Sequence, residues 1–171
     1  MKMQVKFDGN PIEVKGTQAK VGDKAPNATL KNAKGEAVEL NSFFDKVTIV
    51  SVIPNVLTRT CELQTQRFDK VTSDKDYQYV TVGRNTVDEF NQWNKENDLS
   101  VTTLTDDKGE FGQAYGLDIE LDGNALLARA VFVIDADGII QYSEIVDEVV
   151  NEPNYDAALE AADKLAYFFF N

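Results

Sequence analysis

Short runs of alternating apolar and polar residues open the chain and predict antiparallel strands. Residues 5–7 and 12–14 alternate on either side of Asp8-Gly9. An Asp-Gly pair between two alternating runs is a strong signal for a β-hairpin. A second pair of runs, 28–31 and 37–40, brackets Lys34-Gly35 and predicts a second hairpin.

The middle of the chain alternates between strand-like and helix-like segments. Residues 47–53 are almost continuously apolar, which is typical of a central strand covered on both faces. Beyond them the pattern predicts a helix that contains Cys61 and ends near Ser73, followed by a strand over 77–82. A second helix should begin at the capping box of Thr86 and end at Asn97. A strand over 101–105 and a short helix over 111–115, closed by Gly116, complete this part.

The last third of the chain predicts a hairpin and a closing helix. Runs 128–134 and 139–143 bracket the turn Asp135-Ala136-Asp137-Gly138. A helix then begins near Asn154, and its apolar face comprises Ala158, Ala161, Ala162, Leu165, Phe168 and Phe169. This order predicts an α/β protein with a mixed sheet and helices on both faces. No linker divides the sequence, so we expect one domain over residues 1–171.

Charge and hydropathy narrow the class of partner. The net charge is −12, from 29 acidic and 17 basic residues. Such a surface disfavours nucleic acid and anionic membranes, which bind clustered Lys and Arg. No run approaches the roughly 18 apolar residues of a membrane-spanning helix, and the start resembles no signal peptide. We therefore expect a cytoplasmic protein with no nucleic-acid or membrane partner.

Cys61 is the only cysteine, and the chain contains no histidine. One cysteine cannot form an internal disulfide, and zinc and most transition metals lose their usual ligands. We expect no cofactor. Because a Cys–His pair cannot form, any reaction of this thiol must be activated by backbone N–H groups, hydroxyls and arginine.

The position of Cys61 favours a reactive thiol. If Thr58 is the N-cap, Cys61 is the third residue of its helix, where unpaired amides and the helix dipole favour a thiolate. The Thr58 hydroxyl can cap the helix or donate to a thiolate or a bound peroxide, and Pro54 stiffens the connecting loop. The alternative is a small buried apolar side chain, and the local pattern leaves both interpretations open.

Arg129 is the second candidate, because it interrupts an apolar strand between Ala128 and Ala130. If buried, its guanidinium would need an anionic partner. If it lies at the exposed end of the strand, it pairs with one of the many surface carboxylates. The aromatic residues Trp93 and 167–170 are more typical of a core or an interface than of a ligand site.

These residues resemble the bacterial atypical thiol peroxidases of the peroxiredoxin superfamily over nearly the whole chain. The resemblance is carried by Val21-Gly22-Asp23-Lys24-Ala25-Pro26, by the motif Pro54-x-x-x-Thr58-x-x-Cys61, and by strand 126–135 with its arginine. It implies a thioredoxin-like fold with an added N-terminal β-hairpin (residues 1–16), a homodimer, and reduction of hydroperoxides without metal, flavin or haem.

The same resemblance implies a role for each site residue. Cys61 would be the peroxidatic cysteine that becomes a sulfenic acid, Thr58 the hydroxyl that orients peroxide, and Arg129 the cation that stabilises the thiolate and transition state. Pro54 would pack over the site and exclude water. Asn94 stands where most relatives carry a second, resolving cysteine, so the sulfenic acid would need an external thiol, such as thioredoxin or a low-molecular-weight thiol.

Two departures from the family pattern bear on function. Leu57 and Arg59 flank Thr58 where relatives usually have Asp and Pro, and Leu57 makes the rim of the site more apolar, compatible with organic hydroperoxides. The missing second cysteine supports an alternative, a thioredoxin-fold redox sensor or binding module without catalytic turnover.

Overall fold

The structure, a computed structural model, describes the backbone of residues 3–170 and the side chains of residues 3–166. The expected aromatic cluster at 167–170 therefore lies outside the described side chains. The strands are β1 (Met3–Phe7), β2 (Asn10–Val14), β3 (Thr29–Lys31), β4 (Ala37–Glu39), β5 (Thr48–Val52), β6 (Gln78–Gly83), β7 (Thr103–Thr105), β8 (Asp118–Leu121), β9 (Asn124–Leu127), β10 (Ala130–Ile134) and β11 (Ile140–Ile145). The helices are α1 (Arg59–Thr72), α2 (Val87–Glu96), α3 (Glu110–Tyr115) and α4 (Tyr155–Phe170), with a 3₁₀ turn at Leu40–Phe43.

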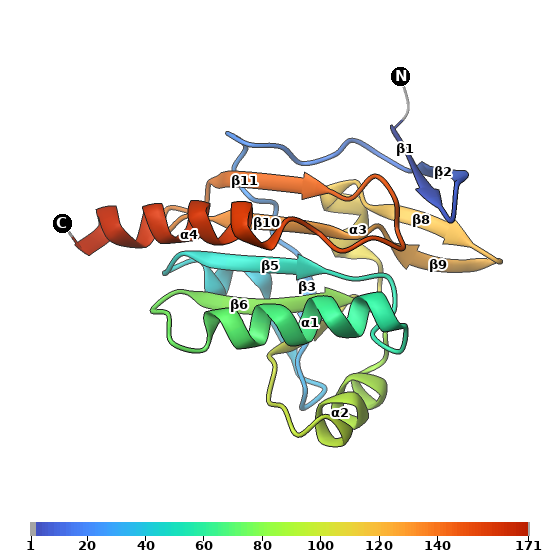
Figure 1. Ribbon diagram of the computed structural model, residues 1–171, viewed down its shortest axis with the longest axis horizontal. Coiled ribbons are helices and arrows are strands. Elements are labelled where there is room, and N and C mark those ends of the chain that lie inside the picture. The colour runs from blue at the N-terminus through green and yellow to red at the C-terminus, as the bar shows by residue number, and fades with distance from the viewer. Residues whose placement is uncertain (1–2, 171) are drawn as a thin grey trace.

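A mixed sheet forms the centre of the molecule, with strand order β11-β10-β5-β6-β7-β3-β4 (Figure 1). Strands β5, β6 and β7 are parallel to one another, and the remaining pairs are antiparallel. Every residue of β5 is buried, as its continuous apolar run predicts for a central strand. The expected mixed α/β sheet is confirmed.

Helices cover both faces of this sheet. On one face, Phe68 of α1 and Ala158 of α4 share a buried cluster with Ile49 of β5 and Val131 of β10. Figure 1 shows α1 and α4 side by side in front of the strands. Alternate residues of a strand point to opposite faces, so the residues next to Ile49 and Val131 in sequence point to the opposite face of the sheet.

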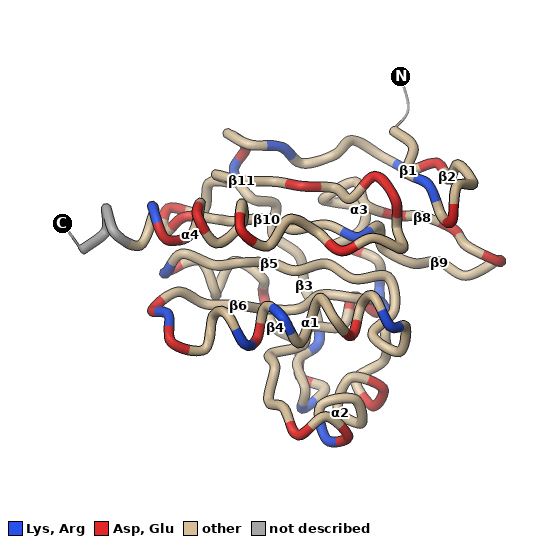
Figure 2. Tube along the Cα trace, viewed as in Figure 1, with Lys and Arg blue, Asp and Glu red and all other residues tan. Residues whose placement is uncertain are grey.

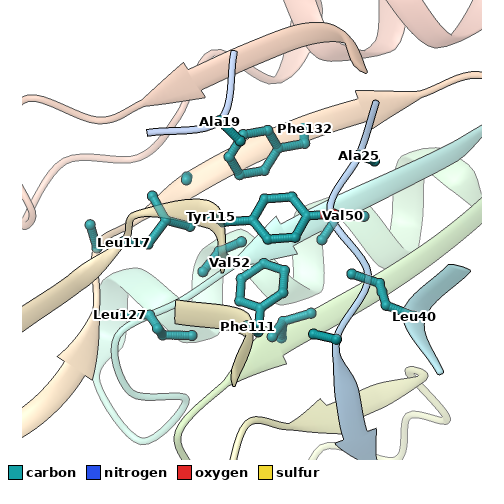
Figure 3. Packing of buried hydrophobic residues seen from close by; sticks show 14 of the residues in the cluster. Ala19, Ala25, Leu40, Val50, Val52, Phe111, Tyr115, Leu117, Leu127 and Phe132 are labelled. Carbon is teal, nitrogen blue, oxygen red and sulfur yellow. The ribbon is translucent and has the colours of Figure 1, made fainter. Parts of the chain in front are cut away.

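The second layer is built around aromatic rings of α3. Phe111 stacks on Tyr115 with ring centroids 4.3 Å apart, and Tyr115 meets Phe132 of β10 edge-on at 5.3 Å. Figure 3 shows these three rings in a column beside Val50 and Val52 of β5. Burial of these apolar groups fixes α3 against the sheet.

Several elements that the local sequence predicts are present in the structure. Both N-terminal hairpins, the Thr86 capping box with Glu89 and the start of α4 after Asn154 are confirmed. The hairpin β8–β9 was not predicted, although its turn, Asp122-Gly123, carries the same signal as the turn of the first hairpin. Both turn residues have positive φ, at 52° and 79°.

The first hairpin, β1–β2, forms its own two-stranded sheet and lies beside β8 at one end of the molecule (Figure 1). Figure 2 shows acidic and basic positions interspersed along the surface elements in this view. Among the described residues, no helix is long and apolar enough to cross a membrane.

Gly116 closes α3 with φ of 66°, and a Cβ there would overlap the backbone of Thr17. We predict that Gly116→Ala destabilises the protein more than Gly123→Ala, whose φ is also positive but whose surroundings are open. The control should lose about 1–2 kcal/mol from the left-handed backbone alone, and Gly116→Ala about 1–3 kcal/mol more from the overlap. Urea denaturation measures both, and equal losses would contradict the packing argument.

Candidate active site

The loop between β5 and α1 is organised by one residue, Asn55. Its side-chain Oδ1 accepts the backbone N–H of Leu57 at 3.0 Å, and its backbone carbonyl accepts the backbone N–H of Thr58 at 3.0 Å. The buried Asn85, at the end of β6, donates to the same Oδ1 at 2.9 Å and accepts from Val56 N at 2.8 Å. These hydrogen bonds satisfy the polar groups of the loop and stabilise the conformation seen here.

Cys61 is the third residue of α1, as the position of Thr58 predicts. Its sulfur accepts the backbone N–H of Asn55 at 3.4 Å. The side chain has an exposed fraction of 0 % and lies in a cluster with Ile53, Val56 and Phe90. An N–H donor at the first turn of a helix stabilises negative charge on sulfur. Because the sulfur is covered in this structure, a reagent in solution reaches it only when the loop or the first turn moves.

Thr58 and Pro54 lie in this loop, but their surroundings differ. Thr58 is the N-cap residue, yet its hydroxyl donates to the carbonyl of Asn55 at 2.8 Å and makes no cap hydrogen bond. The capping role considered for this hydroxyl is therefore wrong, since the short loop places the Asn55 carbonyl within reach first. Thr58 is exposed, whereas Pro54 is buried beside the end of β5.

Arg129 lies between β9 and β10 and has an exposed fraction of 2 %. Placement at an exposed strand end with a surface carboxylate is thereby ruled out. Its Nε donates to the carbonyl of Val149 at 2.7 Å, and its Nη1 donates to Oε1 of Gln64 at 2.9 Å. Neither partner is anionic, and no salt bridge of Arg129 occurs within the described residues. Because both acceptors are neutral, these contacts do not pair the guanidinium with an opposite charge.

Gln64 joins Arg129 to the central sheet. It is fully buried on α1, one turn beyond Cys61. Its Nε2 donates to the hydroxyl of Ser51 in β5 at 2.7 Å. Residues three apart lie on one face of a helix, so the face of α1 that carries the sulfur also carries the partner of the guanidinium. No hydrogen bond joins Arg129 to Cys61 directly among the described residues.

Buried hydroxyls extend this neutral network under α1. Tyr79 shares a hydrogen bond of 2.7 Å with Thr81, and its hydroxyl approaches the carbonyl of Thr65 at 3.3 Å. Thr65 in turn donates to the carbonyl of Cys61 at 2.8 Å. Burial raises the pKa of Tyr79, so its hydroxyl stays protonated. Among the described residues, none of the groups hydrogen-bonded in this network is a carboxylate.

Helix α2 packs against the other side of Cys61. Trp93 belongs to the same buried cluster as the cysteine, and its Nε1 has no hydrogen-bond partner among the described residues. The side-chain amide of Asn94 forms two hydrogen bonds with the backbone of Val101. It donates to the carbonyl and accepts the N–H, both at 3.1 Å. The residue expected at the resolving position therefore fixes the loop after α2.

Sequence reasoning missed three residues of this site, Asn55, Gln64 and Asn85. Gln64 had a usable signal, because a polar residue three positions after Cys61 shares its buried face. Asn55 before Leu57 is compatible with an Asx turn, which is a weak signal. Asn85 had none, since its contact crosses 29 residues of sequence.

Comparison with known proteins gives a consistent result. The family model described as Redoxin matches residues 20–159. The chain is 41 % identical over 164 residues to the thiol peroxidase of Listeria monocytogenes serotype 4b, covering 94 % of this chain and 98 % of that protein. It is 38 % identical over 166 residues to the thiol peroxidase of Bacillus subtilis, covering 95 % and 98 %.

Solved structures confirm the thioredoxin-like peroxiredoxin fold. A peroxiredoxin-like protein from Aquifex aeolicus superimposes with a TM-score of 0.86 at 27 % identity, over 95 % of this chain and 96 % of that one. A thiol peroxidase from Chromobacterium violaceum gives a TM-score of 0.87 over 96 % and 98 %, and its 17 % identity supports the fold alone.

We predict that Gln64→Leu weakens both the fold and the reaction of Cys61. The substitution leaves Nη1 of Arg129 and the Ser51 hydroxyl without their partner, which costs about 1–3 kcal/mol for each group. Gln66→Leu is the matched control, because this half-buried amide on α1 donates to Asn97 and, among the described residues, forms no hydrogen bond with Arg129 or Ser51. Urea denaturation and thiol oxidation by peroxide measure the two effects. Equal behaviour of the two variants would contradict a special role for Gln64.

Proposed function

Because this chain belongs to the Redoxin family and, within it, to the thiol peroxidases, we propose that it reduces hydroperoxides through Cys61 at the expense of an external thiol. The observation that carries the proposal is the placement of the only thiol of the sequence in the first turn of α1, where its sulfur accepts the backbone N–H of Asn55. That environment suits a nucleophilic thiolate.

The first half-reaction oxidises the cysteine. The Cys61 thiolate attacks the distal oxygen of the hydroperoxide, so that an S–O bond forms as the O–O bond breaks. The electron pair of the O–O bond leaves on the second oxygen, which takes a proton and departs as alcohol or water. The sulfur becomes a sulfenic acid, having supplied two electrons.

Fixed donors would stabilise the charge that moves between the oxygens. We assign this role to the guanidinium of Arg129, whose partners are neutral, and to the backbone N–H of Asn55. Thr58 would orient the peroxide through its hydroxyl oxygen, and Pro54 would exclude water from the inner wall of the loop. Opening of the loop precedes binding, because Cys61 is covered in this structure.

The second half-reaction needs a thiol from outside the chain. A donor thiolate attacks the sulfenic sulfur and forms a mixed disulfide, while the sulfenic oxygen leaves as hydroxide and takes a proton to become water. A second donor thiol then attacks the mixed disulfide, which frees Cys61 and leaves the two donors joined by a disulfide. Asn94 cannot supply the first thiol, and its amide is engaged with Val101. Thioredoxin and low-molecular-weight thiols are the proposed donors, and a cytoplasmic homodimer is the proposed state.

The surface near the loop favours an organic hydroperoxide. Leu57 has an exposed fraction of 58 % and Val150 one of 42 %, and both are large apolar side chains. Val150 lies next to α1, because its carbonyl accepts the hydroxyl of Thr60 at 3.0 Å. An alkyl group that contacts either side chain would add apolar contact area.

A second function is a redox sensor that is oxidised once and not recycled. The observation that favours it is the absence of a second cysteine, together with the fixed amide of Asn94. Under this alternative the sulfenic acid persists or oxidises further.

We predict that reduced protein consumes one equivalent of cumene hydroperoxide and gains the mass of one oxygen on Cys61. Trp93 is the only tryptophan and shares a cluster with Cys61, so its fluorescence should follow the oxidation. Thioredoxin or glutathione should then restore the thiol and sustain turnover. Cys61→Ser, which preserves the size of the side chain, should show neither the mass change nor the fluorescence change.

The outcomes separate the two functions. Oxidation followed by recycling supports the peroxidase, and oxidation that no thiol reverses supports the sensor. A Cys61 thiol that stays reduced under excess hydroperoxide contradicts both.

A further inference from the structure

The segment between β11 and α4, residues 147–150, connects the N-terminal hairpin to the candidate site. At its start, the Lys6 N–H donates to the carbonyl of Asp147 at 2.7 Å, and the Val149 N–H donates to the carbonyl of Lys6 at 2.7 Å. Lys6 and Glu148 thus form a parallel bridge, so that segment 147–150 runs alongside β1. The backbone of this segment is anchored to the hairpin.

The side chain of Glu148 adds a second attachment at the turn of the same hairpin. Its Oε2 accepts the N–H of Asp8 at 2.9 Å, and its Oε1 accepts the N–H of Gly9 at 2.8 Å. Both turn residues have positive φ, at 49° and 85°. Successive N–H groups of such a turn converge on one anion, and charge-assisted hydrogen bonds are the stronger kind.

The carboxylate form of Glu148 is favoured by these donors. Desolvation alone would raise its pKa, but the backbone N–H groups of Gly9, Asp8 and Val150 and the charge of Lys6 outweigh it and hold the pKa below its usual value. The attachment is therefore fully formed at neutral pH.

The other end of segment 147–150 contacts the site. The carbonyl of Val149 accepts Nε of Arg129 at 2.7 Å, and the carbonyl of Val150 accepts the hydroxyl of Thr60 at 3.0 Å. Just before the segment, Val146 N donates to the carbonyl of Arg129 at 2.9 Å. Segment 147–150 therefore contacts both the guanidinium of Arg129 and the first turn of α1, and the hairpin β1–β2 anchors this segment.

We propose that Glu148 is a positioning residue that acts through Val149 on Arg129, and that the N-terminal hairpin serves the reaction by fixing segment 147–150. This inference rests on the proposed peroxidase function. Among the described residues, the guanidinium of Arg129 donates to two groups, on Gln64 and Val149, and both must be in place for its remaining N–H groups to meet a developing oxyanion. A small displacement of one anchor misplaces the cation, which slows the reaction without removing it.

The test is a double-mutant cycle between Glu148 and Arg129. The second-order rate constant for oxidation of Cys61 by cumene hydroperoxide is measured by Trp93 fluorescence in wild type, Glu148→Ala, Arg129→Met and the double variant. We expect Glu148→Ala to slow the reaction about tenfold in the wild-type background. In the Arg129→Met background it should change the rate less than about twofold, because its target is gone.

Two further variants provide controls. Glu148→Gln keeps the size and one neutral acceptor, so it should slow the reaction less than Glu148→Ala. Glu120→Ala removes an exposed carboxylate of β8 that pairs with Lys15 at 3.6 Å, at the edge of the same hairpin. It should react at the wild-type rate. Urea denaturation defines conditions in which each variant is folded, and if Glu148→Ala is not, the cycle is run with Glu148→Gln.

The outcomes distinguish failure of this inference from failure of the proposed peroxidase function. A wild-type rate in both Glu148 variants overturns the inference alone, as does equal slowing in the wild-type and Arg129→Met backgrounds. A wild-type protein whose Cys61 does not react with hydroperoxide overturns the proposed function and the inference together.

Discussion

The burial of the Arg129 guanidinium against neutral acceptors is the interaction on which the site depends. Transfer of a charge from water to a protein interior is costly unless hydrogen bonds replace the lost water. Here a carbonyl of segment 147–150 and an amide oxygen of α1 supply those bonds. A carboxylate at either place would cancel the charge. The arrangement therefore leaves the charge of Arg129 unpaired by a carboxylate, as its proposed role beside a thiolate and a peroxide requires.

Cys61 depends on a different set of contacts, which the loop after β5 provides. Asn55 receives hydrogen bonds from the loop and offers its own N–H to the sulfur, while Asn85 ties the loop to the end of β6. The central strands β5 and β6 are parallel, so their carboxyl ends bring these two asparagines to one edge of the sheet. In this structure the resulting loop covers the sulfur, which is inaccessible to solvent.

Much of this could be predicted from local sequence, because turns, caps and buried strands leave local signals. The Asp8-Gly9 turn, the capping box at Thr86 and the third position of Cys61 in its helix were all predicted. The Thr58 hydroxyl was placed wrongly as a helix cap, since the choice between two nearby acceptors depends on loop geometry. Contacts such as Arg129 with Gln64 span 65 positions, and no periodicity reveals them. The sequence likewise does not reveal that Arg129 is buried with a carbonyl and an amide oxygen as acceptors in place of a carboxylate.

The most direct test of the cationic site compares two reactions of the same sulfur. The rate constants for Cys61 with cumene hydroperoxide and with iodoacetamide, a neutral alkylating agent, are measured in wild type and in Arg129→Met. Loss of a charge that stabilises the peroxide transition state should lower the first rate at least about tenfold more than the second. If both rates fall by the same factor, or neither falls, Arg129 does not serve the peroxide reaction and the account is contradicted.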